Sequence, residues 1–281
     1  MATANYTILV DWDADGILEE IAFLSPWFVV QAGDYEDVTQ YVREKPGVKT
    51  ARGRDQIRAL APPAAGRADC ELSNVDKQFS PENTASLLYG NLLPGRKVQI
   101  RATYGGTTYN LWTGYLDDIP QFPERSKRSV GLPSLGGFSK LVGQHISTAL
   151  YQNITTDVAL GHLLDAAGWP AADRTLDTGK TALAWWWLDN EDAFQAARSL
   201  LNTEGPGSAL YEDGSGNIVF ESRHYRLTTT RSTTSQVTFA DTGAEPKYRE
   251  EPFSYNPALK DIINVAQLEV KTRTAKSASV V

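Results

Sequence analysis

The sequence predicts an α+β fold dominated by antiparallel β-strands, arranged as β-barrel or sandwich domains with a small α+β subdomain. Three observations predict this fold. Apolar and polar residues alternate in several short segments, which is the period of a half-buried strand. Glycine pairs and other turn residues separate these segments. Two longer segments, near residues 156–167 and 191–202, instead carry apolar residues at helical spacing.

The first predicted strand covers residues 6–10 and leads directly into an acidic loop. Asp11, Asp13 and Asp15 are followed by Gly16, which matches the first half of a calcium-binding loop. Carboxylates at positions 1, 3 and 5 of such a loop converge on one ion because glycine at position 6 lets the chain turn sharply. A calcium ion is therefore the one cofactor that the sequence suggests.

The second half of the acidic loop departs from the EF-hand pattern. Glu19 takes the ninth position as a further candidate ligand, but the twelfth position, where a bidentate glutamate belongs, is Ala22. Four other acids are candidates to complete a site through folding: Glu20, Asp34, Glu36 and Asp37. The alternative interpretation is a turn rich in aspartate and glycine whose carboxylates are solvated and hold no ion.

The segment of residues 21–30 is the most apolar of the chain and is interrupted by Pro26. It fits a buried strand, or an apolar loop that packs on a neighbouring subunit, because proline is confined to edges and irregular segments of sheets. Residues 37–42 alternate polar with apolar side chains and predict a further short strand.

The stretch of residues 67–116 contains three predicted strands of one antiparallel sheet. The first two have the apolar positions Ala68, Cys70 and Leu72, then Val98, Ile100, Ala102 and Tyr104. Gly105 and Gly106 tolerate the positive φ of a two-residue hairpin turn, so residues 107–116 return beside the second strand. A polar loop, residues 80–94, crosses between the strands, and residues 129–135 predict another strand after it.

A change of pattern near residue 147 marks the predicted small subdomain, residues 147–227. Its first helix has an apolar face of Val158, Leu160, Leu163, Leu164 and Ala167. The second helix covers residues 191–202, and a hairpin of residues 208–211 and 217–224 follows it. The β-rich domain of residues 1–146 precedes this subdomain. Residues 228–281 begin with a flexible connection, 228–236, and bring return strands that complete a second barrel.

Composition and charge exclude several classes of function. The net charge is −7 and the only basic run is the short one at residues 125–128, whereas a dedicated nucleic-acid-binding protein carries a basic stripe. A single cysteine, Cys70, allows no intrachain disulfide and fits synthesis in a reducing cytoplasm. We expect neither a signal peptide nor a membrane-spanning segment, since no run of 18 apolar residues occurs.

The residues that usually carry catalysis form no recognisable site, so we expect no enzymatic activity. His145, His162 and His224 lie far apart, and none has a neighbouring acid or nucleophile that suggests a triad. Adjacent acids, as at 117–118 and 250–251, point to opposite faces of a strand and cannot act as a glycosidase pair.

Three consecutive tryptophans, Trp185, Trp186 and Trp187, form the most unusual aromatic cluster. In a strand they point alternately to the two faces, so at least one packs in the core and the opposite face is a candidate subunit interface. Exposed tryptophans could also stack on sugars, which is a different class of function.

Five phrases of the sequence are distinctive: residues 76–83 (DKQFSPEN), 88–95 (LYGNLLPG), 6–16 (YTILVDWDADG), 37–42 (DVTQYV) and 163–170 (LLDAAGWP). They resemble minor tail proteins of tailed bacteriophages, and more narrowly the hub proteins that close the tail tube at the baseplate. The resemblance implies tail-tube-like antiparallel β-barrels and a ring of three copies at the tail tip of the virion, after assembly in the host cytoplasm.

The resemblance also implies partners. These are further copies of the chain in a homotrimer, the distal tail and tail-tube proteins, the tape-measure protein, and tip or fibre proteins, with DNA only in transit. An acidic chain suits a channel that must release DNA, because like charges repel. Two alternatives remain: a hexameric distal tail protein, and a carbohydrate-binding or cell-wall-degrading module of the tail tip.

Overall fold

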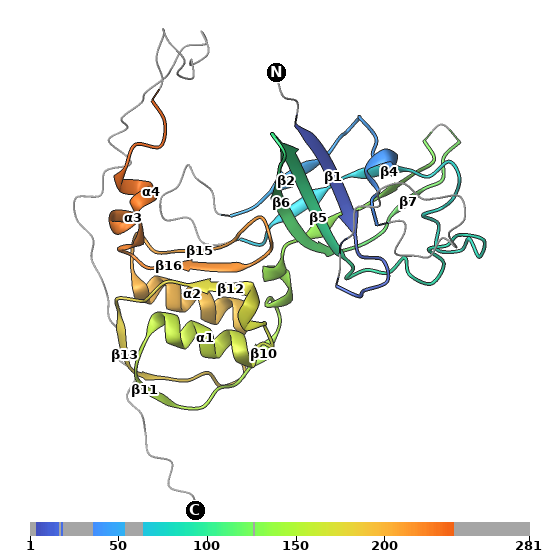
Figure 1. The fold of residues 1–281 in the computed structure, drawn as a ribbon. Helices are drawn as coiled ribbons and strands as arrows, with labels where there is room; N and C mark the ends of the chain where they lie inside the picture. Colours follow the sequence, from blue (N-terminus) through green and yellow to red (C-terminus); the bar gives the residue numbers. More distant parts are fainter. Residues whose placement is uncertain (1–3, 17, 19–35, 54–63, 126, 239–281) are drawn as a thin grey trace, which may run out of the picture. The chain divides into compact units, whose positions relative to one another are not determined.

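The computed structural model describes residues 4–16, 18, 36–53, 64–125 and 127–238 (Figure 1). The chain divides into a unit of residues 1–224 and a unit of residues 225–281, each of which is described by itself. Short strands far outnumber helices in the described part, which confirms the predicted β-dominated α+β fold. No described helix is long and apolar enough to cross a membrane.

The largest sheet has six antiparallel strands in the order β1-β5-β6-β9-β3-β2. Their bounds are β1 Asn5–Val10, β5 Lys97–Tyr104, β6 Thr107–Leu116, β9 Ser134–Leu135, β3 Arg67–Asp69 and β2 Lys49–Ala51. Gly105 and Gly106 form the predicted turn between β5 and β6, with φ of 59° and 80°. The hairpin and the strand before the acidic loop are therefore confirmed.

A second sheet has three antiparallel strands in the order β4-β8-β7, namely β4 Glu71–Ser73, β8 Ser129–Gly131 and β7 Gln121–Phe122. The prediction of single strands over residues 67–73 and 129–135 is wrong, because both segments change sheets midway. The amide of Leu132 donates to the carbonyl of Cys70 at the crossing, 2.9 Å away, and Pro133 has no N–H with which to continue a ladder. Burial, and then the charge of Asp69, raise the pKa of the Cys70 thiol to about 12, so it stays protonated.

The two sheets and the loop between β4 and β5 share one hydrophobic cluster. The largest buried side chains of that cluster are Trp12, Trp112, Phe79, Leu72, Leu88 and Leu132. Phe79 lies 6.2 Å from Trp12 and 5.1 Å from Tyr41, measured between ring centroids. Tyr104, predicted to face the core, is exposed because it lies at the hairpin end, past the buried part of β5.

The strand predicted over residues 37–42 is mostly a 3₁₀ turn, η2 Thr39–Tyr41, with isolated bridges at Asp37 and Val42. Side chains in this segment accept hydrogen bonds from backbone amides that would otherwise pair between strands. Asp37 Oδ1 accepts a hydrogen bond from the amide of Thr39 at 2.9 Å, and Thr39 Oγ1 accepts one from the amide of Ile8 at 2.8 Å. Local polar bonds therefore override the alternating pattern.

The predicted helices are present as α1 Thr156–Ala166 and α2 Ala193–Glu204, and the predicted hairpin as β15 Ala209–Glu212 and β16 Ile218–Glu221. The remaining strands are β10 His145–Ile146, β11 Tyr151–Thr155, β12 Arg174–Leu176, β13 Ala182–Trp186 and β14 Glu191–Asp192, and the short 3₁₀ turns are η3 Gly137–Lys140 and η4 Ala171–Asp173. Antiparallel pairs join β10 to β14 and β11 to β13, while β12 pairs in parallel with β16.

A second hydrophobic cluster extends from Phe138 to Phe220 and holds the buried faces of α1 and α2. Val158 is exposed, contrary to the prediction, because the buried stripe of α1 runs through residues 156, 159, 160, 163 and 164. The unit of residues 1–224 therefore contains two hydrophobic clusters. The domain boundaries expected after residues 146 and 227 stay predictions.

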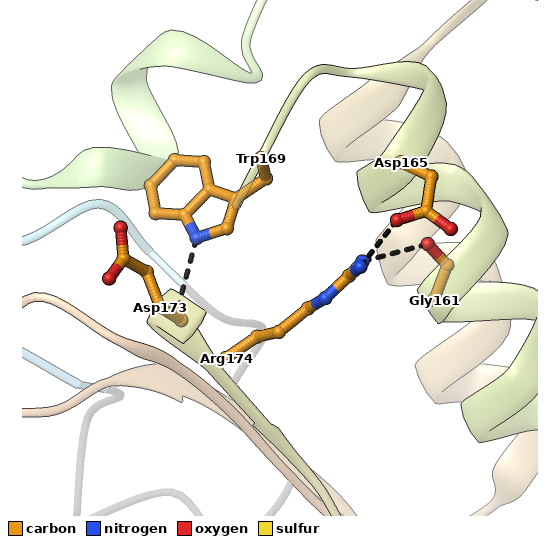
Figure 2. Close-up of polar contacts among 5 residues, drawn as sticks. All are labelled: Gly161, Asp165, Trp169, Asp173 and Arg174. Atoms are coloured by element: carbon orange, nitrogen blue, oxygen red, sulfur yellow. Dashed lines mark hydrogen bonds and ion pairs between the residues drawn. The ribbon is translucent and has the colours of Figure 1, made fainter. Parts of the chain in front are cut away.

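Strand β12 is tied to α1 through Arg174, whose guanidinium reaches across to the helix (Figure 2). Arg174 donates to the carbonyl of Gly161 at 2.9 Å and forms an ion pair with Asp165. Trp169, after the end of α1, donates its indole N–H to the carbonyl of Asp173 at 3.1 Å (Figure 2). These bonds fix the connection between helix and strand, which lies within residues 163–174.

The second unit begins with two short helices, α3 Tyr225–Thr228 and α4 Thr230–Thr233. The flexible connection predicted over residues 228–236 therefore contains a helical turn, in which hydroxyl groups such as that of Thr234 bond to backbone carbonyls one turn earlier. Several predictions lie outside the described residues: the apolar segment 21–30, the return strands after 238, the acids at 250–251, and the candidate ligands Glu19, Glu20 and Asp34.

Glu204, at the end of α2, is fully buried and collects several hydrogen bonds. Its carboxylate accepts from Thr156 Oγ1 at 2.7 Å and from the amides of Lys180, Thr181 and Arg223 at 3.0 to 3.3 Å. Burial, the largest single effect, raises the pKa of Glu204, but these hydrogen bonds together lower it below the ordinary value of 4.5. The charged form is therefore the one that the fold holds.

We expect Glu204→Gln to lower the free energy of unfolding at neutral pH by about 2–4 kcal/mol, because an amide NH₂ would face buried N–H donors. Since the folded pKa of Glu204 lies below 4.5, its contribution is present above that pH and is lost as the pH falls further. Urea unfolding followed by circular dichroism should therefore show a difference between the two proteins that shrinks below about pH 4.5. The exposed Glu82→Gln is the control and should change the free energy of unfolding by less than ~0.5 kcal/mol.

Candidate functional site

The acidic loop after β1 brings four carboxylates together. One oxygen from each of Asp11, Asp13, Asp15 and Glu36 lies within 4.8 Å of the others. Glu36 is present because its segment runs antiparallel to β1. The amide of Val10 donates to the carbonyl of Glu36 at 2.9 Å, and the amide of Val38 to that of Ile8 at 3.0 Å.

The backbone of this loop turns as the sequence pattern predicts. Gly16 has φ of 84°, the left-handed conformation that glycine adopts readily. Its amide donates to Asp11 Oδ2 at 3.1 Å, and the amide of Asp15 reaches Asp13 Oδ1 at 3.4 Å. The loop therefore closes on the first aspartate. Glu19 lies outside the described residues, so its part in the site stays a prediction.

The four acids differ in environment. Asp11 and Glu36 are only 4% and 3% exposed, whereas Asp13 and Asp15 face solvent. Burial raises the pKa of Asp11, the Asp13 carboxylate adds to this, and backbone hydrogen bonds from Gly16 and Ala14 oppose it. Asp11 Oδ1 is buried and has no hydrogen-bond partner within the described residues. Such a carboxylate is costly unless a cation or a donor satisfies it.

The tryptophan cluster is split between the core and the surface. Trp185, in β13, is 43% exposed, while its neighbour Trp186 packs against the second hydrophobic cluster, 6.1 Å from the ring of Tyr151. Trp187 is half-buried. Alternation along the strand thus leaves Trp185 as the most exposed of the three, and its role in an interface stays a prediction.

The histidines have structural contacts. His145 Nδ1 lies 2.9 Å from the carbonyl of Asn190, and the ring of His162 stacks on Tyr151 with a centroid distance of 3.9 Å. Asp118, one of the paired acids, accepts a hydrogen bond from the amide of the next residue, Ile119, at 2.7 Å. These contacts are those of residues that hold turns and strands in place.

The loop of residues 75–96, between β4 and β5, is ordered by its own polar side chains. Ser86 Oγ donates to the carbonyl of Gln78 at 2.6 Å, and Asn83 Nδ2 donates to that of Lys77 at 2.9 Å. Asn74 Oδ1, just before the loop, accepts from the amide of Phe79 at 3.0 Å. Leu88 is buried in the first hydrophobic cluster. The loop is therefore a fixed structure with its own anchors.

The same loop presents apolar side chains to solvent. Leu87 is 44%, Tyr89 54% and Leu93 50% exposed, on either side of the buried Leu88 and Leu92. We call Leu87, Tyr89 and Leu93 the loop patch. Sequence reasoning treated this segment as a polar loop and missed the patch. The apolar run Leu87–Tyr89 could have indicated the patch, because three consecutive apolar residues cannot all face the core in a surface loop.

A buried carboxylate that the sequence did not single out joins segments far apart in the chain. Glu212, in β15, accepts a hydrogen bond from the amide of Gly66 at 3.2 Å and a very short one from that of Phe138. Burial raises the pKa of Glu212, and these two backbone hydrogen bonds oppose the rise. A Cβ on Gly136 would lie 2.0 Å from Glu212 Oε2, so glycine is required there.

No protein-family profile and no curated protein sequence matches this chain. Among solved structures it is similar to the 43 kDa tail protein of prophage MuSo2 from Shewanella oneidensis, with 12% identity and a TM-score of 0.46 over 78% of this chain and 54% of that one. A tail protein from Neisseria meningitidis has 15% identity and a TM-score of 0.44, over 76% of this chain and 50% of that one. A prophage tail protein from Listeria monocytogenes has 8% identity and a TM-score of 0.43, over 88% of this chain and 56% of that one.

The chain spans about half the length of these solved structures. All three are described as tail proteins.

We expect Gly136→Ala to lower the free energy of unfolding by about 1–3 kcal/mol, because its methyl group must displace a carboxylate held by two backbone amides. Gly161→Ala in α1 is the matched control. Its Cβ would meet only Leu176 at 3.8 Å, so it should be neutral or stabilise by about 0.5–1 kcal/mol. Equal effects of the two substitutions in thermal or urea unfolding would contradict a special role for the Glu212 contact.

Proposed function

We propose that this chain is a structural component of a bacteriophage tail tip, a trimeric hub that closes or extends the tail tube. In this role it docks tip proteins and fibres and opens for DNA ejection. The observation that carries the proposal is the loop of residues 75–96. The phrases that resemble tail hub proteins, residues 76–83 and 88–95, lie in a fixed loop that displays the loop patch.

The loop patch has a free-energy cost while it is exposed to water. Apolar side chains gathered on a rigid segment expose area that is stabilised by burial at about 25 cal/mol per Å², and such patches mark interaction sites. Ser86 and Asn83 hold the segment without help from a partner, so little ordering entropy is lost on contact. A ring in which each copy covers the loop patch of its neighbour satisfies this surface.

The proposed role is non-enzymatic, and its further partners follow from the position at the tail tip: the distal tail protein, the tape-measure protein, and tip or fibre proteins. Trp185 is the second candidate contact, because it is the exposed member of its cluster. DNA passes through the ring, and a net charge of −7 limits its retention there.

The symmetry of the tail tip tests the proposal directly. Cryo-electron microscopy of particles that carry this protein should show three copies around the channel axis. Six copies would instead support the hexameric distal tail protein, and absence of the chain from purified particles would contradict a structural role.

Substitutions in the loop patch test which surface forms the ring. Tyr89→Glu with Leu93→Glu should weaken trimerisation at least tenfold, since charge replaces apolar area at the contact. Val158→Glu, on the exposed side of α1, is the control and should leave trimerisation unchanged. Sedimentation of the purified chains over a range of concentrations measures both. Trimers of equal stability in all three proteins would exclude the loop patch from the interface.

A further inference from the structure

The carboxylate of Asp11 is one of four buried side-chain groups in the described residues that have an oxygen without a hydrogen-bond partner, and unlike Glu71 it has no cation beside it there. Its Oδ2 accepts the amide of Gly16, but its Oδ1 is buried without a hydrogen-bond partner in the described part of the chain. The side chain points into a group of acids, so further negative charge surrounds it.

The carboxylate oxygens lie close enough together for one cation to contact all four. Calcium binds oxygen at 2.3–2.6 Å, so two ligands on opposite sides of the ion lie about 5 Å apart. Magnesium binds at 2.0–2.1 Å, which limits that separation to about 4.2 Å. The four carboxylates each offer one oxygen within 4.8 Å of the others, which is close enough for a single ion to contact all four. A site of four carboxylates is typical of calcium, because magnesium keeps several waters and is usually bound by one or two carboxylates.

We propose that Asp11, Asp13, Asp15 and Glu36 bind a calcium ion that fastens the segment of residues 36–38 to the end of β1. The ligand set differs from the one suggested by loop spacing alone, because Glu36 joins through its pairing with β1. Asp13 and Asp15 face solvent and give the ion a path of entry, while Asp11 and Glu36 hold it from the buried side. Water supplies the remaining ligands.

The site has a mechanical consequence for the protein. The ion joins residues 11 and 36 and binds only where both are in place, so it stabilises the folded state in proportion to its occupancy. β1 carries Ile8 and Val10 into the first hydrophobic cluster, and Trp12 follows from the same segment. Calcium therefore acts on the packing of the β-sheet core, independently of whether the chain forms a ring.

The test is calcium binding by the full chain after removal of metal ions with a chelator. Calcium should raise the melting temperature in a saturable way, with a Kd on the order of 10⁻⁴ M or tighter, and magnesium at equal concentration should have a much smaller effect. Terbium should luminesce on excitation of tryptophan, since Trp12 lies between two ligands, and calcium should displace it.

Substitutions distinguish a calcium site of four carboxylates from a loop whose acids are solvated and bind no ion. Asp13→Asn with Asp15→Asn changes only exposed side chains and should weaken calcium binding at least tenfold, as should Glu36→Gln. Asp117→Asn with Asp118→Asn alters an exposed acidic pair elsewhere and should leave binding unchanged. Asp11→Asn keeps an oxygen for the Gly16 amide and removes the buried charge, so it should raise the melting temperature without calcium and abolish the response to calcium.

Two results would overturn the proposal. The first is an unchanged melting temperature and no displaceable terbium luminescence in the unsubstituted chain, which would mean that the acids hold no ion. The second is equal loss of binding in the Asp117–Asp118 control, which would mean that calcium binds to negative surface charge in general. Neither result bears on the symmetry of the tail tip, so the two proposals fail separately.

Discussion

The buried carboxylate of Glu212 is the contact on which the arrangement of the first unit depends. It brings β15 against the backbone at Gly66, just before β3, and at Phe138, in η3. The amide of Gly136 donates to the carbonyl of Gly66 at 2.7 Å, so the two chain segments also hold each other. The first cluster reaches from Ile8 to Leu132 and the second begins at Phe138, so this contact lies where the two cores meet along the chain.

The sequence predicts the local structure wherever local rules decide it. Gly105 and Gly106 specify the turn, and alternation correctly predicts β1 and β5 as strands. Burial itself does not alternate there, because Leu9 and Gln99 are buried along with their neighbours. The sequence does not predict the structure where contacts between distant residues determine it. Nothing near Cys70 signals that the strand changes sheets there, because the crossing is set by Leu132, far along the chain. The 3₁₀ turn at residues 39–41 likewise depends on a bond from Ile8 to Thr39.

The candidate sites divide in the same way. The spacing of Asp11, Asp13 and Asp15 is readable because a loop motif is local, whereas Glu36 was one of several acids until its pairing with β1 placed it. Glu212 was not identified at all, since its partners are backbone amides that have no identity in the sequence. The loop patch was missed because the consecutive apolar residues Leu87, Leu88 and Tyr89 follow neither the helical nor the strand period, so the pattern does not tell which of them is buried.

Asp11 differs from the buried carboxylates of Glu204 and Glu212 in the hydrogen-bond donors around it. Glu204 receives a hydroxyl and several amides, and both oxygens of Glu212 accept from backbone N–H groups. Each of these two carboxylates therefore accepts hydrogen bonds from donors that the fold supplies. Asp11 has a donor for one oxygen only, and three more acids lie around it, among them the buried Glu36. The fold supplies the hydrogen bonds of Glu204 and Glu212 but, within the described residues, none for this oxygen of Asp11, and the proposed calcium ion would satisfy it.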